Sequence, residues 1–79
     1  MRLLDVTTDR PVQQAQLYLS IEEARELRDC LNALLVDPEL SDHEHLIDKD
    51  GWDLSFSILT ERKLAGSRYT ARERKLFTE

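Results

Sequence analysis

The stretch DKDGWDLSFSI, residues 48–58, joins a turn signal to a strict alternation of apolar and polar side chains. The segment DKDG is rich in residues that favour tight turns, and the alternation after it is typical of a strand with one buried face. The residues before the turn supply the other arm. We therefore predict a β-hairpin with strands at residues 43–47 and 52–60, and we expect this hairpin to fix the architecture.

The turn allows two registers, and its charges favour one of them. A two-residue loop would place Asp48 opposite Asp53, and like charges directly opposite each other are unfavourable. A three-residue loop instead ends on Gly51 in the left-handed conformation, with Asp48 at the first turn position, where aspartate is favoured. We therefore predict the three-residue loop, which puts both histidines, His43 and His45, on the sheet face away from the helix.

A helix is predicted at residues 21–36. Ser20 and Glu23 form a capping box at its start, and Asp37-Pro38 ends it because the residue before a proline avoids the α region. Apolar residues then recur with the 3.6-residue period of a helix. This stripe is expected to face the sheet, and it consists of Ile21, Ala24, Leu27, Leu31, Leu34 and Leu35.

Two further strands are predicted, at residues 2–6 and 14–19. In the second, Ala15, Leu17 and Leu19 alternate with polar residues. With the hairpin, these strands predict a two-layer α+β fold with a four-stranded antiparallel sheet in the order 1-2-4-3 and one main helix on one face. A second capping box, at Thr70, predicts a short C-terminal helix that runs to about residue 77.

Charge is distributed unevenly along the 79 residues, whose net charge is −5. Residues 1–61 carry 5 basic and 14 acidic side chains, a net of −9, whereas residues 62–79 carry 6 basic and 2 acidic side chains, a net of +4. We therefore expect a single α+β domain at residues 1–61 and a basic C-terminal extension at residues 62–79. The acidic body should repel nucleic acid and anionic membranes.

The sequence predicts a cytoplasmic protein. Its longest uninterrupted apolar run, residues 33–36, has four members, far fewer than a secretory signal or a membrane span needs. Its single cysteine, Cys30, cannot form an internal disulfide, which fits a reducing compartment. We therefore expect no membrane partner.

One cluster has the spacing of metal ligands. His43 and His45 are two residues apart on a predicted strand, so they point to the same side. Asp53 or Asp42 could supply a third ligand. The DKDG turn resembles part of a calcium loop but lacks the first carboxylate and the bidentate glutamate. The chain has no glycine-rich phosphate loop and no recognisable nucleophile arrangement, so we predict no cofactor and no catalytic residue.

The sheet face away from the helix and the basic extension are the predicted interaction surfaces. The extension alternates cations with aromatic rings, which can bind a phosphate backbone or stack on bases. It can equally lie across an acidic body, its own or that of a neighbouring subunit, and the net of −9 on residues 1–61 favours this second interpretation. The predicted interaction residues are Tyr18, Ile47, Leu59, Arg62, Arg68, Tyr69, Arg72 and Lys75.

Three segments, LYLSIEEARELRD at residues 17–29, HEHL at 43–46 and LSFSI at 54–58, resemble short uncharacterised bacterial proteins built as strand–helix–hairpin. The resemblance spans residues 17–60. The resemblance implies a strand–helix–hairpin topology and does not imply an activity. The basic extension is where this chain departs from the pattern.

Three functions follow from these features. The favoured one is a small non-enzymatic interaction or regulatory module that acts as a homodimer, with another protein as a possible partner. The second is a nucleic-acid-associated protein that uses the basic extension. The third is a metal-dependent activity at His43 and His45.

Overall fold

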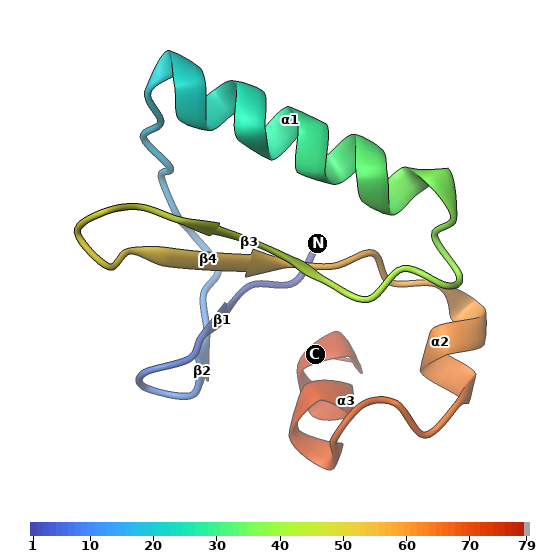
Figure 1. Cartoon of the computed structure of the whole chain (residues 1–79). Coiled ribbons are helices and arrows are strands. Elements are labelled where there is room, and N and C mark those ends of the chain that lie inside the picture. The colour runs from blue at the N-terminus through green and yellow to red at the C-terminus, as the bar shows by residue number, and fades with distance from the viewer. Residues whose placement is uncertain (79) are drawn as a thin grey trace.

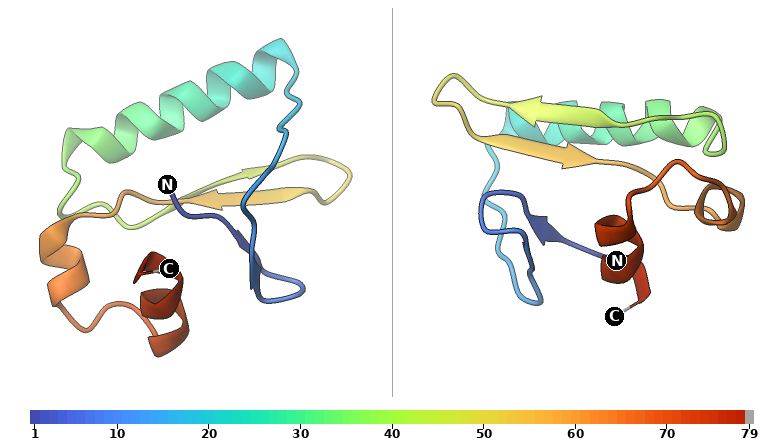
Figure 2. Two further views of the ribbon diagram at one scale, coloured as in Figure 1. Left: turned by 180° about the vertical axis from the view of Figure 1, so that it is seen from behind. Right: turned by 90° about the horizontal axis from the view of Figure 1, so that it is seen from below.

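The computed structural model describes residues 1–78 and shows an α+β protein. Its elements, in chain order, are β1 (Leu4–Asp5), β2 (Arg10–Pro11), α1 (Ile21–Val36), β3 (Glu44–Ile47), β4 (Asp53–Phe56), α2 (Glu61–Ala65) and α3 (Ala71–Thr78). The β3–β4 hairpin has α1 on one side and β1, β2 and α3 on the other (Figure 1). Seen from below, β1, β2 and α3 lie beside the hairpin and not directly beneath it (Figure 2).

The predicted four-stranded sheet is wrong. The described residues form two separate two-stranded sheets, β1–β2 and β3–β4, both antiparallel. The predicted strand at 14–19 belongs to neither, because β1 turns back at once and pairs with residues 10–11 instead. A hairpin between near neighbours closes a very short loop, so it costs less entropy than pairing with a distant strand.

Asp5 builds the turn between β1 and β2. Its Oδ1 atom accepts hydrogen bonds from the amides of Thr7 at 2.9 Å and Thr8 at 3.2 Å. Hydrogen bonds from the Thr8 amide and hydroxyl, with a smaller contribution from the Thr7 amide, lower the pKa of the Asp5 carboxyl. Asp9 completes the turn with a φ of 61°, a left-handed conformation that aspartate tolerates. This local turn removes residues 4–11 from any larger sheet.

The predicted register of the second hairpin is confirmed, since Leu46 pairs with Leu54. The Asp48 amide donates to the Trp52 carbonyl at 3.1 Å, and Gly51 has the expected left-handed φ of 88°. The Asp48 carboxylate also accepts from the Trp52 amide at 3.0 Å. Both strands are shorter than predicted: β3 begins at Glu44 and not at residue 43, and β4 ends at Phe56 and not at residue 60.

Helix α1 has the predicted bounds and the predicted capping box. The Glu23 amide donates to Ser20 Oγ at 3.1 Å, and the Ser20 amide donates to Glu23 Oε1 at 2.8 Å. The predicted buried stripe is only partly confirmed, because Leu34, 4% exposed, is its one fully buried member. The exposed members of the stripe are Ile21, Ala24, Leu31 and Leu35. The helix packs on β3, so one narrow line of side chains is covered.

The C-terminal region contains the predicted helix α3 and a short helix that was not predicted, α2. Thr60 caps α2, its side chain accepting from the Lys63 amide at 3.1 Å. The predicted boundary between residues 61 and 62 falls inside α2. Lys63, beyond that boundary, is only 5% exposed, so α2 is part of the packed body.

The fold leaves an unusually large surface open to solvent. Among the described residues, the fully buried apolar side chains are Leu34 and Leu46. The chain exposes 6773 Å², whereas a compact protein of 9.2 kDa exposes about 4,900 Å². Its radius of gyration is 13.6 Å, against about 11.6 Å for a compact chain of this length. One chain by itself therefore builds only a small core.

Candidate interaction surface

The two histidines lie side by side with carboxylates as partners. His45 Nδ1 lies 2.9 Å from Asp53 Oδ1, and His43 Nδ1 lies 3.3 Å from Asp42 Oδ1. The two rings meet edge to face, with centroids 4.8 Å apart. Within residues 1–78, no group of three His, Cys, Asp or Glu side chains is arranged to hold a metal ion. The structure thus brings His45 and Asp53 together, as a pair half open to solvent.

An open acidic groove runs along α1 next to the start of β3. Burial raises the pKa of the Cys30 thiol, and the Glu44 carboxylate, followed by Glu26 and Asp29, raises it further. The thiol is therefore kept protonated, which is the opposite of what a nucleophilic cysteine needs. The groove is lined by Glu22, Arg25, Glu26, Asp29, Cys30, Ala33 and Glu44.

Since Glu44 lies in this groove, the alternation of side chains along β3 directs His43 and His45 to the opposite face of the hairpin. This is the placement that the turn chemistry predicts.

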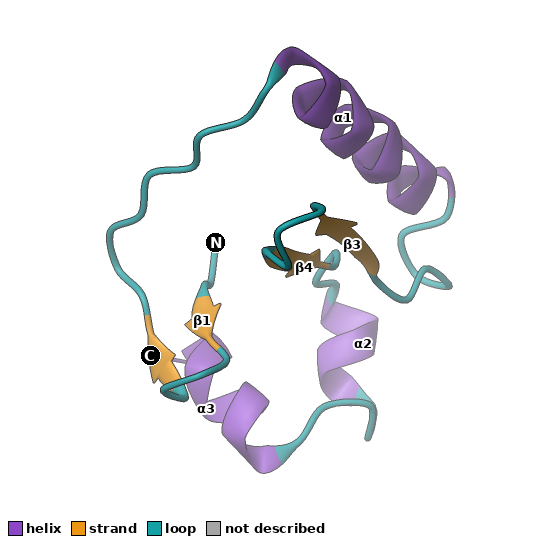
Figure 3. Cartoon of the chain, turned by 60° about the vertical axis from the view of Figure 1, so that its left-hand side comes forward, coloured by secondary structure: helices purple, strands orange, loops and turns teal. Residues whose placement is uncertain are grey.

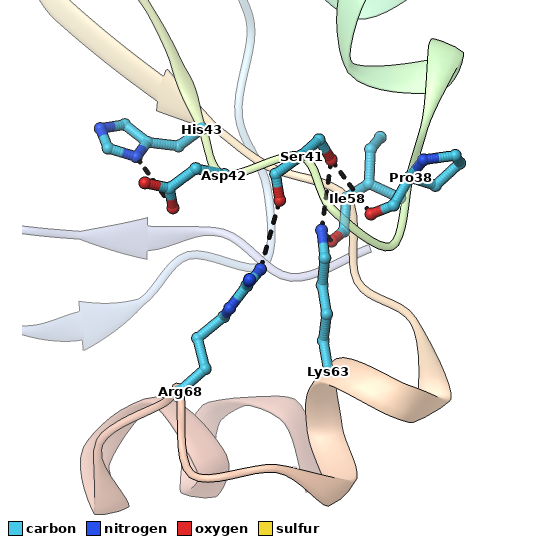
Figure 4. Close-up of polar contacts among 7 residues, drawn as sticks. All are labelled: Pro38, Ser41, Asp42, His43, Ile58, Lys63 and Arg68. Atoms are coloured by element: carbon cyan, nitrogen blue, oxygen red, sulfur yellow. Dashed lines mark hydrogen bonds and ion pairs between the residues drawn. The ribbon is translucent and has the colours of Figure 1, made fainter.

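A polar junction ties the loop after α1 to α2 (Figure 4). The Lys63 ammonium donates to the Ile58 carbonyl at 3.0 Å and to Ser41 Oγ at 3.3 Å. The Ser41 hydroxyl donates onward to the Pro38 carbonyl at 3.0 Å, and Arg68 donates to the Ser41 carbonyl at 3.2 Å. Sequence reasoning missed this junction, and its role is to hold two segments together.

The basic extension contacts the body of its own chain. Arg72 forms an ion pair with Asp9 at 3.0 Å, and Arg2 donates to the Leu76 carbonyl at 3.1 Å. Within the extension itself, Arg74 donates to the carbonyl oxygens of Leu64, at 2.7 Å, and Gly66.

Of the predicted interaction residues in the extension, Arg68 and Arg72 bind within the chain, and Tyr69 packs edge to face on Phe77 with ring centroids 5.0 Å apart. Arg62 and Lys75 are exposed, and their side chains form no hydrogen bond or ion pair with residues 1–78. Two of the five predicted residues of the extension are thus open to a partner.

The predicted apolar contact residues are exposed and lie on three different segments of the chain. Ile47 is on β3, Leu59 follows β4, and Tyr18 lies on the connection between β2 and α1. Tyr18 is 83% exposed and Leu17 beside it is 58% exposed. Other large exposed apolar side chains are Met1, Val6, Ile21, Leu31, Leu35, Val36, Leu40 and Trp52.

The connection between β2 and α1 carries two of these exposed apolar side chains, Leu17 and Tyr18, next to each other. It runs around the outside of the molecule, clear of the β3–β4 hairpin (Figure 3). In the described part of the chain, no backbone hydrogen bond involves residues 13–19. A feature of the sequence could have marked it, because residues 11–21 carry no charged side chain.

No protein-family model, curated protein or solved structure matches this chain. The resemblance to strand–helix–hairpin proteins stays a prediction, and function must be argued from the geometry. Among the described helices, none combines the length and the apolar character that a membrane crossing requires.

Proposed function

We propose that this protein is a small non-enzymatic interaction module that acts as a homodimer. The observation that carries the proposal is the exposed area of 6773 Å², about 1,800 Å² more than a compact chain of this mass exposes. A stable protein–protein interface covers about 800 Å² on each partner. One such interface fits within the excess.

A second copy is the preferred partner for two reasons. Closed symmetric dimers are the most common assemblies of small soluble chains, and they need no other gene product. The extension that could attract an anionic partner is also largely occupied within the chain, since Arg68 and Arg72 bind oxygen atoms of residues 1–61 and Arg74 binds the Leu64 carbonyl. The apolar surface therefore offers more binding energy than the charged one.

The two alternatives have less support. A nucleic-acid interface would rely on the cations of the extension that remain free, chiefly Arg62 and Lys75, next to a body whose charge repels phosphate. A metal-dependent activity would need a third ligand beside the histidines, and residues 1–78 do not provide that arrangement.

The test is the mass of the full chain in solution, measured by sedimentation velocity and light scattering from about 1 to 100 μM. We expect twice the chain mass of 9.2 kDa at the upper concentrations, with dissociation on dilution. A monomer at about 100 μM would end the proposal, because no functional interface of this size is expected to be so weak.

A further inference from the structure

The connection at residues 14–19 has the pattern of a strand but no strand partner. Ala15, Leu17 and Leu19 alternate with Gln14, Gln16 and Tyr18, as in a strand with one apolar face. The backbone amides and carbonyls of these residues form no hydrogen bond within the described part of the chain. The segment therefore presents a free ladder of donors and acceptors.

Nothing on this segment protects it from pairing with another chain. Proteins usually guard exposed strand edges with lysine, other charges or proline. Here the 11 residues from 11 to 21 contain no charge, although 34% of the whole chain is charged. Pro11 lies at the start of this run, outside residues 14–19. An exposed, uncharged segment whose backbone groups have no partners in the described part of the chain is a site for β-strand addition.

We propose that residues 14–19 pair antiparallel with the same residues of a second copy, about a twofold axis at Leu17. The inference rests on the proposed homodimer and names its contact surface. With the axis at Leu17, the two Leu17 side chains face each other and Ala15 faces Leu19 of the second copy. Gln16 then faces Tyr18 of the second copy on the polar side.

This register is preferred because it matches like faces. Moving the axis to Gln16 would place Gln13 opposite Leu19. Sliding one strand by one residue along the other would put apolar residues opposite polar ones. At the Leu17 axis, six apolar side chains from two copies form one continuous face. Pairing also covers Leu17 and Tyr18, which are 58% and 83% exposed in one chain.

Disulfide trapping tests the contact and its register in the full chain. The background is Cys30→Ala, which removes the one natural thiol. Directly opposed residues of an antiparallel pair are about 4.5–5.5 Å apart between Cα atoms, within the range that a disulfide bridges. We expect Leu17→Cys to form a covalent dimer under mild oxidation.

Two variants serve as controls for the trapping. Ala15→Cys tests the register, since the two Ala15 positions are separated along the strands and should not cross-link. Val36→Cys tests specificity, because Val36 is 86% exposed at the far end of α1. Efficient trapping through either control at the rate of Leu17→Cys would overturn the proposed pairing.

Charge complementation tests the same twofold axis without forming a disulfide. In Leu17→Lys and in Leu17→Glu, like charges meet at the twofold axis, so each variant should dimerise at least about tenfold more weakly than the natural chain. A mixture of the two variants should recover association, because opposite charges then meet. Circular dichroism checks that each variant keeps its helices, and recovery in the mixture shows that both fold.

The outcomes separate this inference from the proposed function. A chain that is monomeric at about 100 μM would contradict both the homodimer and the pairing at residues 14–19. A dimer that Leu17→Cys does not trap and Leu17→Lys does not weaken overturns the pairing at residues 14–19, while the homodimer stands on another surface. Trapping at Leu17 with recovery in the mixture supports both.

Discussion

At the scale of single residues, Lys63 is the clearest case of a side chain placed by tertiary contacts. It is 5% exposed, and its ammonium group is held by a carbonyl and a hydroxyl oxygen. A buried cation is retained only when such acceptors replace water. Removing the ammonium leaves the Ile58 carbonyl and the Ser41 hydroxyl without this donor, and buried polar groups without partners are costly.

Lys63→Met tests this role, because methionine keeps most of the apolar stem and removes the charged donor. We expect the free energy of unfolding to fall by about 1–3 kcal/mol, measured by urea denaturation at a fixed protein concentration. Lys75→Met is the matched control on an exposed lysine and should change it by about 0.5 kcal/mol or less. Equal effects of the two substitutions would show that the junction in Figure 4 contributes nothing to stability.

At the scale of elements, α1 is a helix whose apolar stripe is wider than the surface it rests on. Only one line of the stripe meets the hairpin, with Leu34 buried in the last turn of α1 and Leu27 half-buried. The neighbouring line, which includes Leu31 and Leu35, stays exposed. A two-stranded hairpin is too narrow to cover a stripe that a four-stranded sheet would bury.

Truncation of adjacent leucines tests which line packs. Leu34→Ala should lower the free energy of unfolding by about 2–5 kcal/mol, because it opens a cavity between α1 and β3. Leu35→Ala removes the same atoms from a side chain that is 56% exposed, and we expect about 1 kcal/mol or less. Denaturant titration compares the two, and a larger effect at Leu35 would mean that the helix is rotated.

At the scale of the whole molecule, charge is separated in sequence but joined in space. The acidic residues 1–61 and the basic residues 62–79 meet through contacts such as Arg72–Asp9 and Arg68 with the Ser41 carbonyl. The extension is thereby anchored to the body of its own chain. Such exposed pairs orient segments more than they stabilise them.

This arrangement predicts that the protein does not bind nucleic acid at physiological salt. The net charge is −5, and few cations of the extension remain free to contact phosphates. Fluorescence anisotropy with labelled single- and double-stranded oligonucleotides at about 150 mM salt checks this. Binding at about micromolar affinity that disappears in the double variant Arg62→Ala, Lys75→Ala would favour the nucleic-acid alternative instead.

The elements that could be predicted from the sequence are those whose causes are local. Helix α1 follows from its capping box, its apolar period and the Asp37-Pro38 stop, and all of these signals lie within one segment. The register of the β3–β4 hairpin follows from the carboxylate of Asp48 and the left-handed Gly51, within one turn. Short-range contacts of this kind need no knowledge of the remaining fold.

The placement of these elements against one another was decided in the tertiary structure. Residues 14–19 have the alternation of a strand, yet alternation does not specify a pairing partner. Strand β1, which was their predicted partner, pairs with residues 10–11 through a local turn instead. The face of α1 that is buried, and the burial of Lys63, likewise depend on contacts between distant segments. Such contacts are settled by a competition among many partners of similar free energy, which no single stretch of sequence records.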